Sequence, residues 1–363
     1  MQPQIRLIRR MSKTRCRYVL IGWWLMGVVA ACAPRYHGPV SDHFNGRRFI
    51  NPGEPKRSGG GVVQWLLHRD KGPWPRQPNA FVGARPAPRV LGDSLVVTFV
   101  NHSTFLLQTA GLNILTDPVW SGRVGPYNLI GIKRRRPPGL RFADLPPIDV
   151  VLLSHSHYDH LDLRTLRRLR KAYNPLFVTP LGVSYLPRRV GGRVARELDW
   201  FDTLRVNDKL GLTCTPARHF SNRGMGDRDR TLWAGYLLHT TFGTIYFCGD
   251  SGYGEHFRHI GERAARSASG AIKLALLPIG SYRPQWFMAP VHVSPADAVR
   301  ALEDIRSAGA PGCRAVGIHF GTFQQGDDGL YEPADDLRRA LRNRGLTDEQ
   351  FSVPQEGRPM VFK

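Results

Sequence analysis

The stretch His155-Ser156-His157-Tyr158-Asp159-His160 places three histidines and one aspartate within six residues. It directly follows Val150-Val151-Leu152-Leu153, an apolar run typical of a buried strand. A strand that ends here presents these side chains together at the edge of a sheet. Imidazole and carboxylate groups are good ligands for zinc and for neighbouring divalent metals. The stretch therefore predicts a metal site at the end of a buried strand.

Short apolar runs typical of strands recur from Leu95 onward, with fewer helical patterns between them. Strand-rich halves that are each closed by helices predict an α+β fold, a sandwich of two sheets with helices on the outer faces. One helix start is well marked, because Ser294-Pro295-Ala296-Asp297 supplies an N-cap, a proline at the first position and an acid in the first turn. We expect strands at Val96–Val100, Phe105–Gln108, Asn113–Thr116, Val150–Ser154, Phe177–Thr179, Leu212–Pro216, Leu232–Leu238, Thr244–Cys248, Leu274–Pro278 and Ala315–His319, and helices at Leu163–Arg170, Pro295–Ser307 and Pro333–Arg342.

Three further potential ligands follow later strand-like runs, and each lies at or just beyond the end of its run. They are His219, Asp250 and His319. The six-residue stretch already holds more ligands than one ion needs when other segments also contribute. The sequence therefore indicates a centre for more than one metal ion.

The spacing H-x-H-x-D-H resembles the signature of the metallo-β-lactamase superfamily. This resemblance implies an αββα sandwich and two divalent metal ions, most commonly Zn²⁺. It further implies that Asp250 bridges the two ions and that Asp159 belongs to the catalytic machinery. By the same resemblance, His155, His157 and His219 would hold one ion, and Asp159, His160 and His319 would hold the other.

Two divalent ions about 3.5–4 Å apart can share a water, lower its pKa from about 15.7 towards about 7, and neutralise charge on a phosphoryl or carbonyl oxygen. Such a centre needs no side-chain nucleophile. The sequence is in keeping with this, because it contains no G-x-S-x-G elbow.

A narrower resemblance rests on several stretches matched in one order, among them Leu277–Tyr282 and His292–Pro295, and covers most of residues 95–335. It points to the N-acylphosphatidylethanolamine-hydrolysing phospholipase D family. It implies hydrolysis of such phospholipids to phosphatidate and an N-acylethanolamine, with His292 beside the metals in substrate binding or proton transfer. His292 precedes the helix capped by Ser294, and a helix N-terminus favours anions such as phosphate. The stretches that carry the resemblance are Asn101–Phe105, Thr116–Pro118, Leu277–Tyr282, Trp286–Met288, His292–Pro295 and His319–Phe323.

The first 32 residues are interpreted as a targeting segment. Basic residues precede an apolar run that is shorter than the roughly 20 residues of a membrane-spanning helix. The run ends in Val29-Ala30-Ala31-Cys32, which resembles the lipobox of bacterial lipoproteins, so we expect an acyl anchor on Cys32 and a place in the bacterial cell envelope. An uncleaved anchor helix is the alternative. We expect a Gly- and Pro-rich tether and wrapping segment over residues 33–90 and the catalytic domain over residues 91–363.

The formal net charge of +22 favours anionic partners, either phospholipid or nucleic acid. A nuclease would suit this charge, but export would separate it from cytoplasmic RNA, so a phospholipid substrate is expected and nucleic acid is not. A hydrolase of lactones or other small esters and phosphoesters is the main alternative. A non-catalytic lipoprotein that binds in the envelope is a third, although it would have no need of a complete ligand set. The sequence leaves the oligomeric state open.

Overall fold

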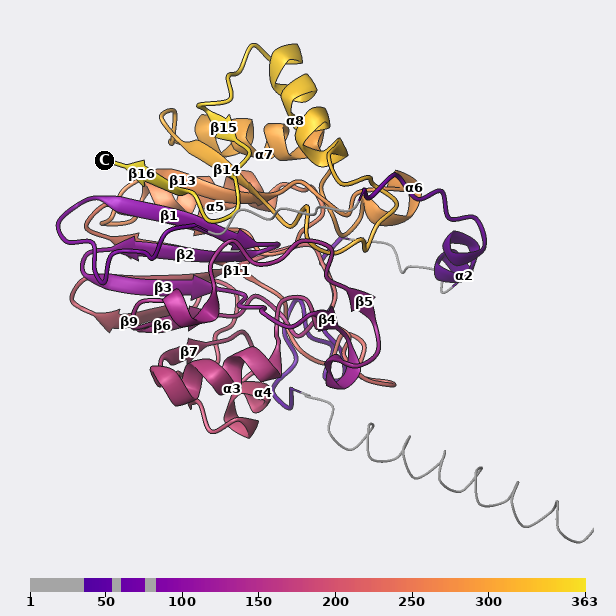
Figure 1. Cartoon of the computed structure of the whole chain (residues 1–363), viewed down its shortest axis with the longest axis horizontal. Helices are drawn as coiled ribbons and strands as arrows, with labels where there is room; N and C mark the ends of the chain where they lie inside the picture. Colours follow the sequence, from indigo (N-terminus) through magenta and orange to yellow (C-terminus); the bar gives the residue numbers. More distant parts are fainter. Residues whose placement is uncertain (1–35, 54–59, 76–82) are drawn as a thin grey trace, which may run out of the picture.

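Two seven-stranded sheets pack face to face in the computed structural model, which describes residues 36–53, 60–75 and 83–363 (Figure 1). The main apolar core lies between them, because buried side chains from both sheets belong to one cluster that includes Val97, Phe99, Tyr236 and Leu276. Helices cover the outer faces. This is the αββα sandwich and the α+β class that the sequence predicts.

The first sheet has the order β16-β1-β2-β3-β6-β7-β8. Its strands β1 to β3 form an antiparallel meander, and β3, β6, β7 and β8 run parallel to one another. The strands are β1 (Leu95–Asn101), β2 (Thr104–Thr109), β3 (Leu112–Thr116), β6 (Val150–Leu152), β7 (Leu176–Val178), β8 (Arg193–Val194) and β16 (Pro359–Phe362).

The second sheet has the order β15-β14-β13-β12-β11-β10-β9. Strands β12 to β15 are parallel, whereas β9 to β12 are antiparallel. The strands are β9 (Thr203–Asn207), β10 (Leu210–Thr215), β11 (Gly235–Thr240), β12 (Gly243–Phe247), β13 (Ile272–Pro278), β14 (Arg314–Ile318) and β15 (Phe351–Ser352). A separate hairpin, β4 (Arg123–Val124) with β5 (Ile132–Lys133), projects from the loop after β3.

Each sheet has its own helices. Helix α3 packs on the outer face of the first sheet, where Leu166 and Leu169 join a core cluster with Leu115 and Val151. Helix α7 packs on the second sheet and begins as predicted, since the Ser294 hydroxyl accepts a hydrogen bond from the backbone N–H of Asp297. The helices are α2 (Gly60–Leu67), α3 (Leu163–Ala172), α4 (Tyr185–Arg189), α5 (His256–Ala265), α6 (Gln285–Met288), α7 (Pro295–Ser307) and α8 (Glu332–Asn343), with 3₁₀ turns at Pro126–Asn128 and Phe142–Asp144.

The segment before the sandwich, where we expect a tether and a wrapping segment, includes one helix among its described residues. It contains α2, which is held because the indole of Trp65 stacks on Phe287 and donates a hydrogen bond to Asp327. The predicted leader and Cys32 lie outside the described residues. Within the part of the chain that the structure describes, no helix is both long and apolar enough to cross a bilayer.

One strand start was predicted too early. The expected strand at Leu232–Leu238 begins only at Gly235, because Leu232 and Trp233 turn away from the sheet. Both pack into a separate cluster with Phe44 and Phe49 from the N-terminal segment. The apolar character of these two residues therefore reflects contact with that segment rather than strand pairing.

Candidate metal centre

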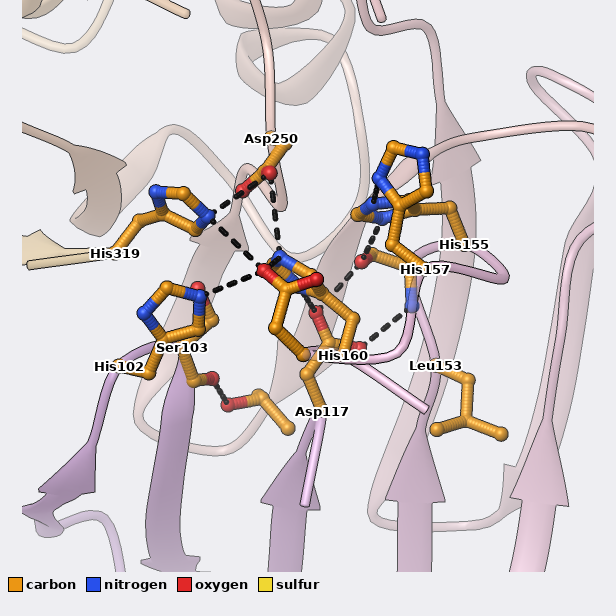
Figure 2. Close-up of polar contacts among 12 residues, drawn as sticks. His102, Ser103, Asp117, Leu153, His155, His157, His160, Asp250 and His319 are labelled. Atoms are coloured by element: carbon orange, nitrogen blue, oxygen red, sulfur yellow. Dashed lines mark hydrogen bonds and ion pairs between the residues drawn. The ribbon is translucent and has the colours of Figure 1, made fainter. Parts of the chain in front are cut away.

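All seven predicted ligands lie at one end of the sandwich, on loops that follow strands. The four residues of the six-residue stretch follow β6 in the first sheet. The other three follow strands of the second sheet, His219 after β10, Asp250 after β12 and His319 after β14. The site is thus assembled between the two sheets, with ligands from both (Figure 2).

Three imidazoles form one half of the site. Nε2 of His155 lies 2.8 Å from Nδ1 of His157, which lies 3.3 Å from Nε2 of His219. These three residues form one group with the ligand-atom spacing of a metal site. They are the set that the sequence resemblance assigns to one ion.

The other half of the site centres on two carboxylates. Oδ2 of Asp250 lies 3.1 Å from Nε2 of His319, 3.2 Å from Nε2 of His160 and 3.6 Å from Nε2 of His219. Oδ2 of Asp159 lies 3.1 Å from the same nitrogen of His160. Asp250 therefore faces ligands of both halves, which is the arrangement expected of a bridging residue.

Three residues at this end of the fold, among them His102 with a φ of 49°, have left-handed backbone conformations. His319 has a φ of 61° and Asp117 a φ of 34°, values that are uncommon outside glycine. Such conformations concentrate at functional sites, where the surrounding structure holds them. Here they turn each side chain inward as its strand ends.

Burial and charge together make this an environment for cations. Burial opposes ionisation of Asp159 and Asp250, but the neighbouring imidazoles, His160 foremost, hold the pKa of both carboxyls well below the ordinary value. Burial likewise opposes protonation of His319, but Asp250 and Asp159 raise its pKa to about 9. Two buried negative charges thus require positive charge beside them, which protonated histidines or metal ions can supply.

The donor set fits a pair of divalent ions. Nε2 of both His160 and His319 and Oδ1 of Asp250 are buried and make no hydrogen bond within the described chain. Buried polar atoms are normally hydrogen-bonded or coordinated to a metal. Imidazole nitrogens together with carboxylate oxygens are a donor set that suits zinc and neighbouring transition metals.

His292 also lies at the centre. Its Nδ1 is 3.9 Å from Oδ2 of Asp250 and makes no hydrogen bond, and its side chain is 12% exposed. Burial lowers the pKa of His292 to about 3, so the imidazole is neutral near pH 7. His219, Asp250 and His292 form a further group with the spacing of metal ligands. His292 is therefore close enough to the other ligands to bind a metal ion, and it is also placed to contact a substrate bound at the centre.

Two residues at the site were missed as site residues by sequence reasoning, although both stand in stretches quoted for the resemblance. Nε2 of His102 lies 2.9 Å from Oδ2 of Asp159. Oδ2 of Asp117 accepts a hydrogen bond from Nδ1 of His160 at 2.7 Å. Asp117 directly follows β3, so the strand-end position that pointed to the other ligands was present here too.

A family model described as a beta-lactamase superfamily domain matches residues 112–320. The chain belongs to the metallo-β-lactamase superfamily. It is 33% identical over 276 residues to the N-acyl-phosphatidylethanolamine-hydrolyzing phospholipase D 1 of Caenorhabditis elegans, a match that covers 72% of this chain and 74% of that one. The corresponding mitochondrial enzyme of Saccharomyces cerevisiae is 32% identical over 73% of this chain and 55% of its own. These matches establish the narrower relationship to that phospholipase D family.

Solved structures extend the comparison to the fold. The isothiocyanate hydrolase from Delia radicum gut bacteria superposes with a TM-score of 0.57 at 22% identity, over 74% of this chain and 99% of that one. A metallo hydrolase from Ignicoccus hospitalis superposes with a TM-score of 0.54 at 19% identity, over 74% and 99%. These likenesses show the metallo-β-lactamase fold. The family relationship and the ligand cluster together make the chain a metal-dependent hydrolase of that fold.

Proposed function

We propose that the chain is a zinc-dependent phosphodiesterase of the phospholipase D type. It hydrolyses N-acylphosphatidylethanolamine-like phospholipids to phosphatidate and an N-acylethanolamine. The position of His292 carries this proposal. Its imidazole lies at the edge of the ligand cluster, where it can transfer a proton to the leaving group of a bound substrate or coordinate a metal. The names of the nematode and yeast relatives support the choice of substrate.

Bound ions would supply an activated water and positive charge for the phosphoryl oxygens. The residues of the chain then have separate tasks. Asp159 and Asp250 hold the negative charge that retains the ions, and His102 orients Asp159 through its hydrogen bond. His292, which is neutral near pH 7, positions the phosphodiester and passes the proton of the attacking water to the leaving alkoxide, a task worth about 10²–10⁴-fold in rate.

The helix behind His292 favours the phosphate. Helix α7 starts three residues after it, and its N-terminal end carries partial positive charge from the peptide dipoles. Cys32 carries an acyl anchor in this proposal, which keeps the enzyme in the envelope membrane that contains its substrate. Neither a nucleic acid nor a further cofactor is required.

A panel of phospholipids tests the proposal directly. The metal-loaded chain is incubated in ¹⁸O-labelled water with N-acylphosphatidylethanolamine, phosphatidylethanolamine and phosphatidylcholine, and products are read by mass spectrometry. Attack at phosphorus places the label in phosphatidate and not in the released alcohol. Turnover of lactones without cleavage of any phospholipid would replace the proposal by the lactonase alternative, and metal analysis of the same sample identifies the ion.

A further inference from the structure

The hairpin formed by β4 and β5 displays large apolar side chains to solvent. Tyr127, Leu129 and Ile130 at its tip are 74%, 77% and 71% exposed, and Ile132 beside them is also exposed. Single exposed apolar residues are ordinary on soluble proteins, whereas a contiguous group marks an interaction surface. The tip therefore has the character of an interaction surface.

The hairpin is held in this shape by hydrogen bonds. The Asn128 amide donates to the backbone carbonyl of Arg123, whose guanidinium donates to the carbonyl of Gly131, each at 3.0 Å. At the base, the guanidinium of Arg134 donates to the carbonyls of Ser121 and Val119. The tip is thus fixed with its apolar side chains pointing away from the core.

A second apolar projection lies at the same end of the molecule. Helix α2 is fastened to the loops beyond β13 and β14 by the contacts of Trp65 with Phe287 and Asp327. In Figure 1, α2 and the β4–β5 hairpin both project from the end of the sandwich at which the strands deliver the metal ligands. Four apolar side chains of α2 are exposed: Val62, Val63, Leu66 and Leu67.

Cations lie just behind the hairpin tip. A hollow of about 480 Å³ separates the hairpin from α3 and α4, and its lining includes Arg164, Arg167, Arg189 and Arg223. Tyr158 of the six-residue stretch is also in its wall, so the hollow adjoins the metal centre. Among the described lining residues there is one carboxylate, which accepts hydrogen bonds from the backbone of the neighbouring loop. The hollow is therefore strongly basic.

We propose that the hairpin tip and the outer face of α2 enter a bilayer that contains anionic phospholipid, and that the basic hollow receives headgroup phosphates. Apolar side chains at the front with cations behind them match the order of layers in such a surface. A nucleic acid would meet the cations and leave the apolar tip in water. The choice of lipid rests on the proposed function. The docking mode rests on the hairpin, α2 and the hollow.

A fluorescent probe at the tip tests this docking. The full chain carries Leu129→Cys, with the leader cysteines changed by Cys16→Ser and Cys32→Ser, and an environment-sensitive dye is attached. The cysteines of the described residues are all buried, so labelling is selective. The matched control is Leu91→Cys, which is 75% exposed and lies beside the turn at Gly111, the far end of β2 and β3.

Vesicles of phosphatidylethanolamine and phosphatidylglycerol are added, with a quencher on the acyl chains. We expect the probe at position 129 to brighten severalfold and to be quenched, and the probe at position 91 to do neither, even if the leader holds both proteins on the vesicles. Equal quenching at the two positions, or none at 129, would overturn the docking. Brightening that grows with protein concentration and needs no vesicles would assign the tip to a second copy of the chain.

The basic hollow is tested in the same labelled chain. Arg164→Ala with Arg167→Ala should shift quenching to a higher fraction of phosphatidylglycerol, because each cation near an anionic surface is worth about fivefold in partitioning. Arg338→Ala with Arg339→Ala, on the exposed face of α8, is the matched control. If both double substitutions shift quenching equally, the basic hollow does not contribute to binding of anionic lipid. Quenching without phospholipid hydrolysis would leave the docking in place and refute the proposed function, and hydrolysis without quenching would do the reverse.

Discussion

Oδ2 of Asp117 accepts a hydrogen bond from Nδ1 of His160 at 2.7 Å, and both side chains are fully buried. The same carboxylate accepts hydrogen bonds from the backbone N–H and the hydroxyl of Ser154 at 2.7 and 2.6 Å. Nε2 of His160 is therefore the atom turned towards Asp250 (Figure 2). A carboxylate behind a ligating histidine fixes its tautomer and raises its basicity.

We therefore expect Asp117→Asn to weaken metal binding by about 10–100-fold, as is typical when a group behind a ligand is removed. The measurement is a competition titration of the metal-free chain against a chelator of known affinity. Asp208→Asn, in the exposed turn between β9 and β10, is the control. Equal affinities in the two variants would mean that Asp117 does not support a ligand.

Asp250→Asn removes one of the two buried negative charges that face the ions. We expect about two ions per native chain, and lower occupancy together with lower activity in the variant, because the loss of charge weakens the bridge. Elemental analysis of the purified proteins gives the occupancy. Full occupancy in a chain that carries both His155→Ala and His160→Ala would contradict the assignment of the site.

His292→Ala should lower kcat on N-acylphosphatidylethanolamine by about 10²–10⁴-fold, the usual contribution of general acid–base help. Metal content should stay close to that of the native chain if His292 serves the substrate. His259→Ala, on the exposed surface of α5, is the matched control. A parallel fall in metal content and kcat would instead make His292 a ligand.

Asp328 offers a prediction on stability. Burial raises the pKa of Asp328 to about 6 from an ordinary 3.8, so the folded chain favours its protonated form. The protonated carboxyl of Asp328 is tolerated in the folded chain, whereas the ionised form is not. The stability that protonation gives is therefore fully present below pH 3.8 and is lost as the pH rises through about 6. Asp328→Asn is neutral at all pH values, and its gain in unfolding free energy should grow with pH to at most about 3 kcal/mol.

Urea unfolding of both chains, in chelator throughout and at several values between about pH 4 and about pH 8, measures this difference. The chelator keeps metal release out of the comparison. A gain that does not change with pH would show that the carboxyl of Asp328 keeps its ordinary pKa.

The lipid anchor is tested at Cys32. We expect the mature chain to begin at Cys32 and to carry acyl chains, each buried CH₂ adding about 0.8 kcal/mol to membrane attachment. Cys32→Ser should prevent both acylation and the associated cleavage, as read by mass spectrometry of the membrane fraction, whereas Cys16→Ser should change neither. Unchanged cleavage and fractionation of the Cys32→Ser chain would refute the lipoprotein interpretation.

The sequence predicts most of this architecture because the metal ligands sit where apolar runs stop. Asp250 and His319 can each be located from the sequence alone, because each follows the end of a predicted strand. Asp117 meets the same criterion, but its task depends on His160, which is 43 residues away and pairs with it only in the folded chain. His102 also directly follows a strand, β1, but its task depends on Asp159, which is 57 residues away in the sequence.

Some of the elements that the sequence did not predict depend on distant partners. Strand β16 is only four residues long. It forms by pairing with β1, which lies at the start of the sandwich in the sequence, whereas β16 lies at its end. Helix α2 depends on stacking between Trp65 and Phe287. The β4–β5 hairpin was also not predicted, because its two strands are only two residues long.

The division of the ligands between the two sheets has a consequence for how the protein matures. Neither half of the chain holds a complete dinuclear site, since the first sheet supplies His155 to His160 and the second supplies His219, Asp250 and His319. A complete site for two ions therefore forms only when the two sheets have packed together. A full complement of two ions in a preparation would thus mark molecules in which both sheets are correctly assembled.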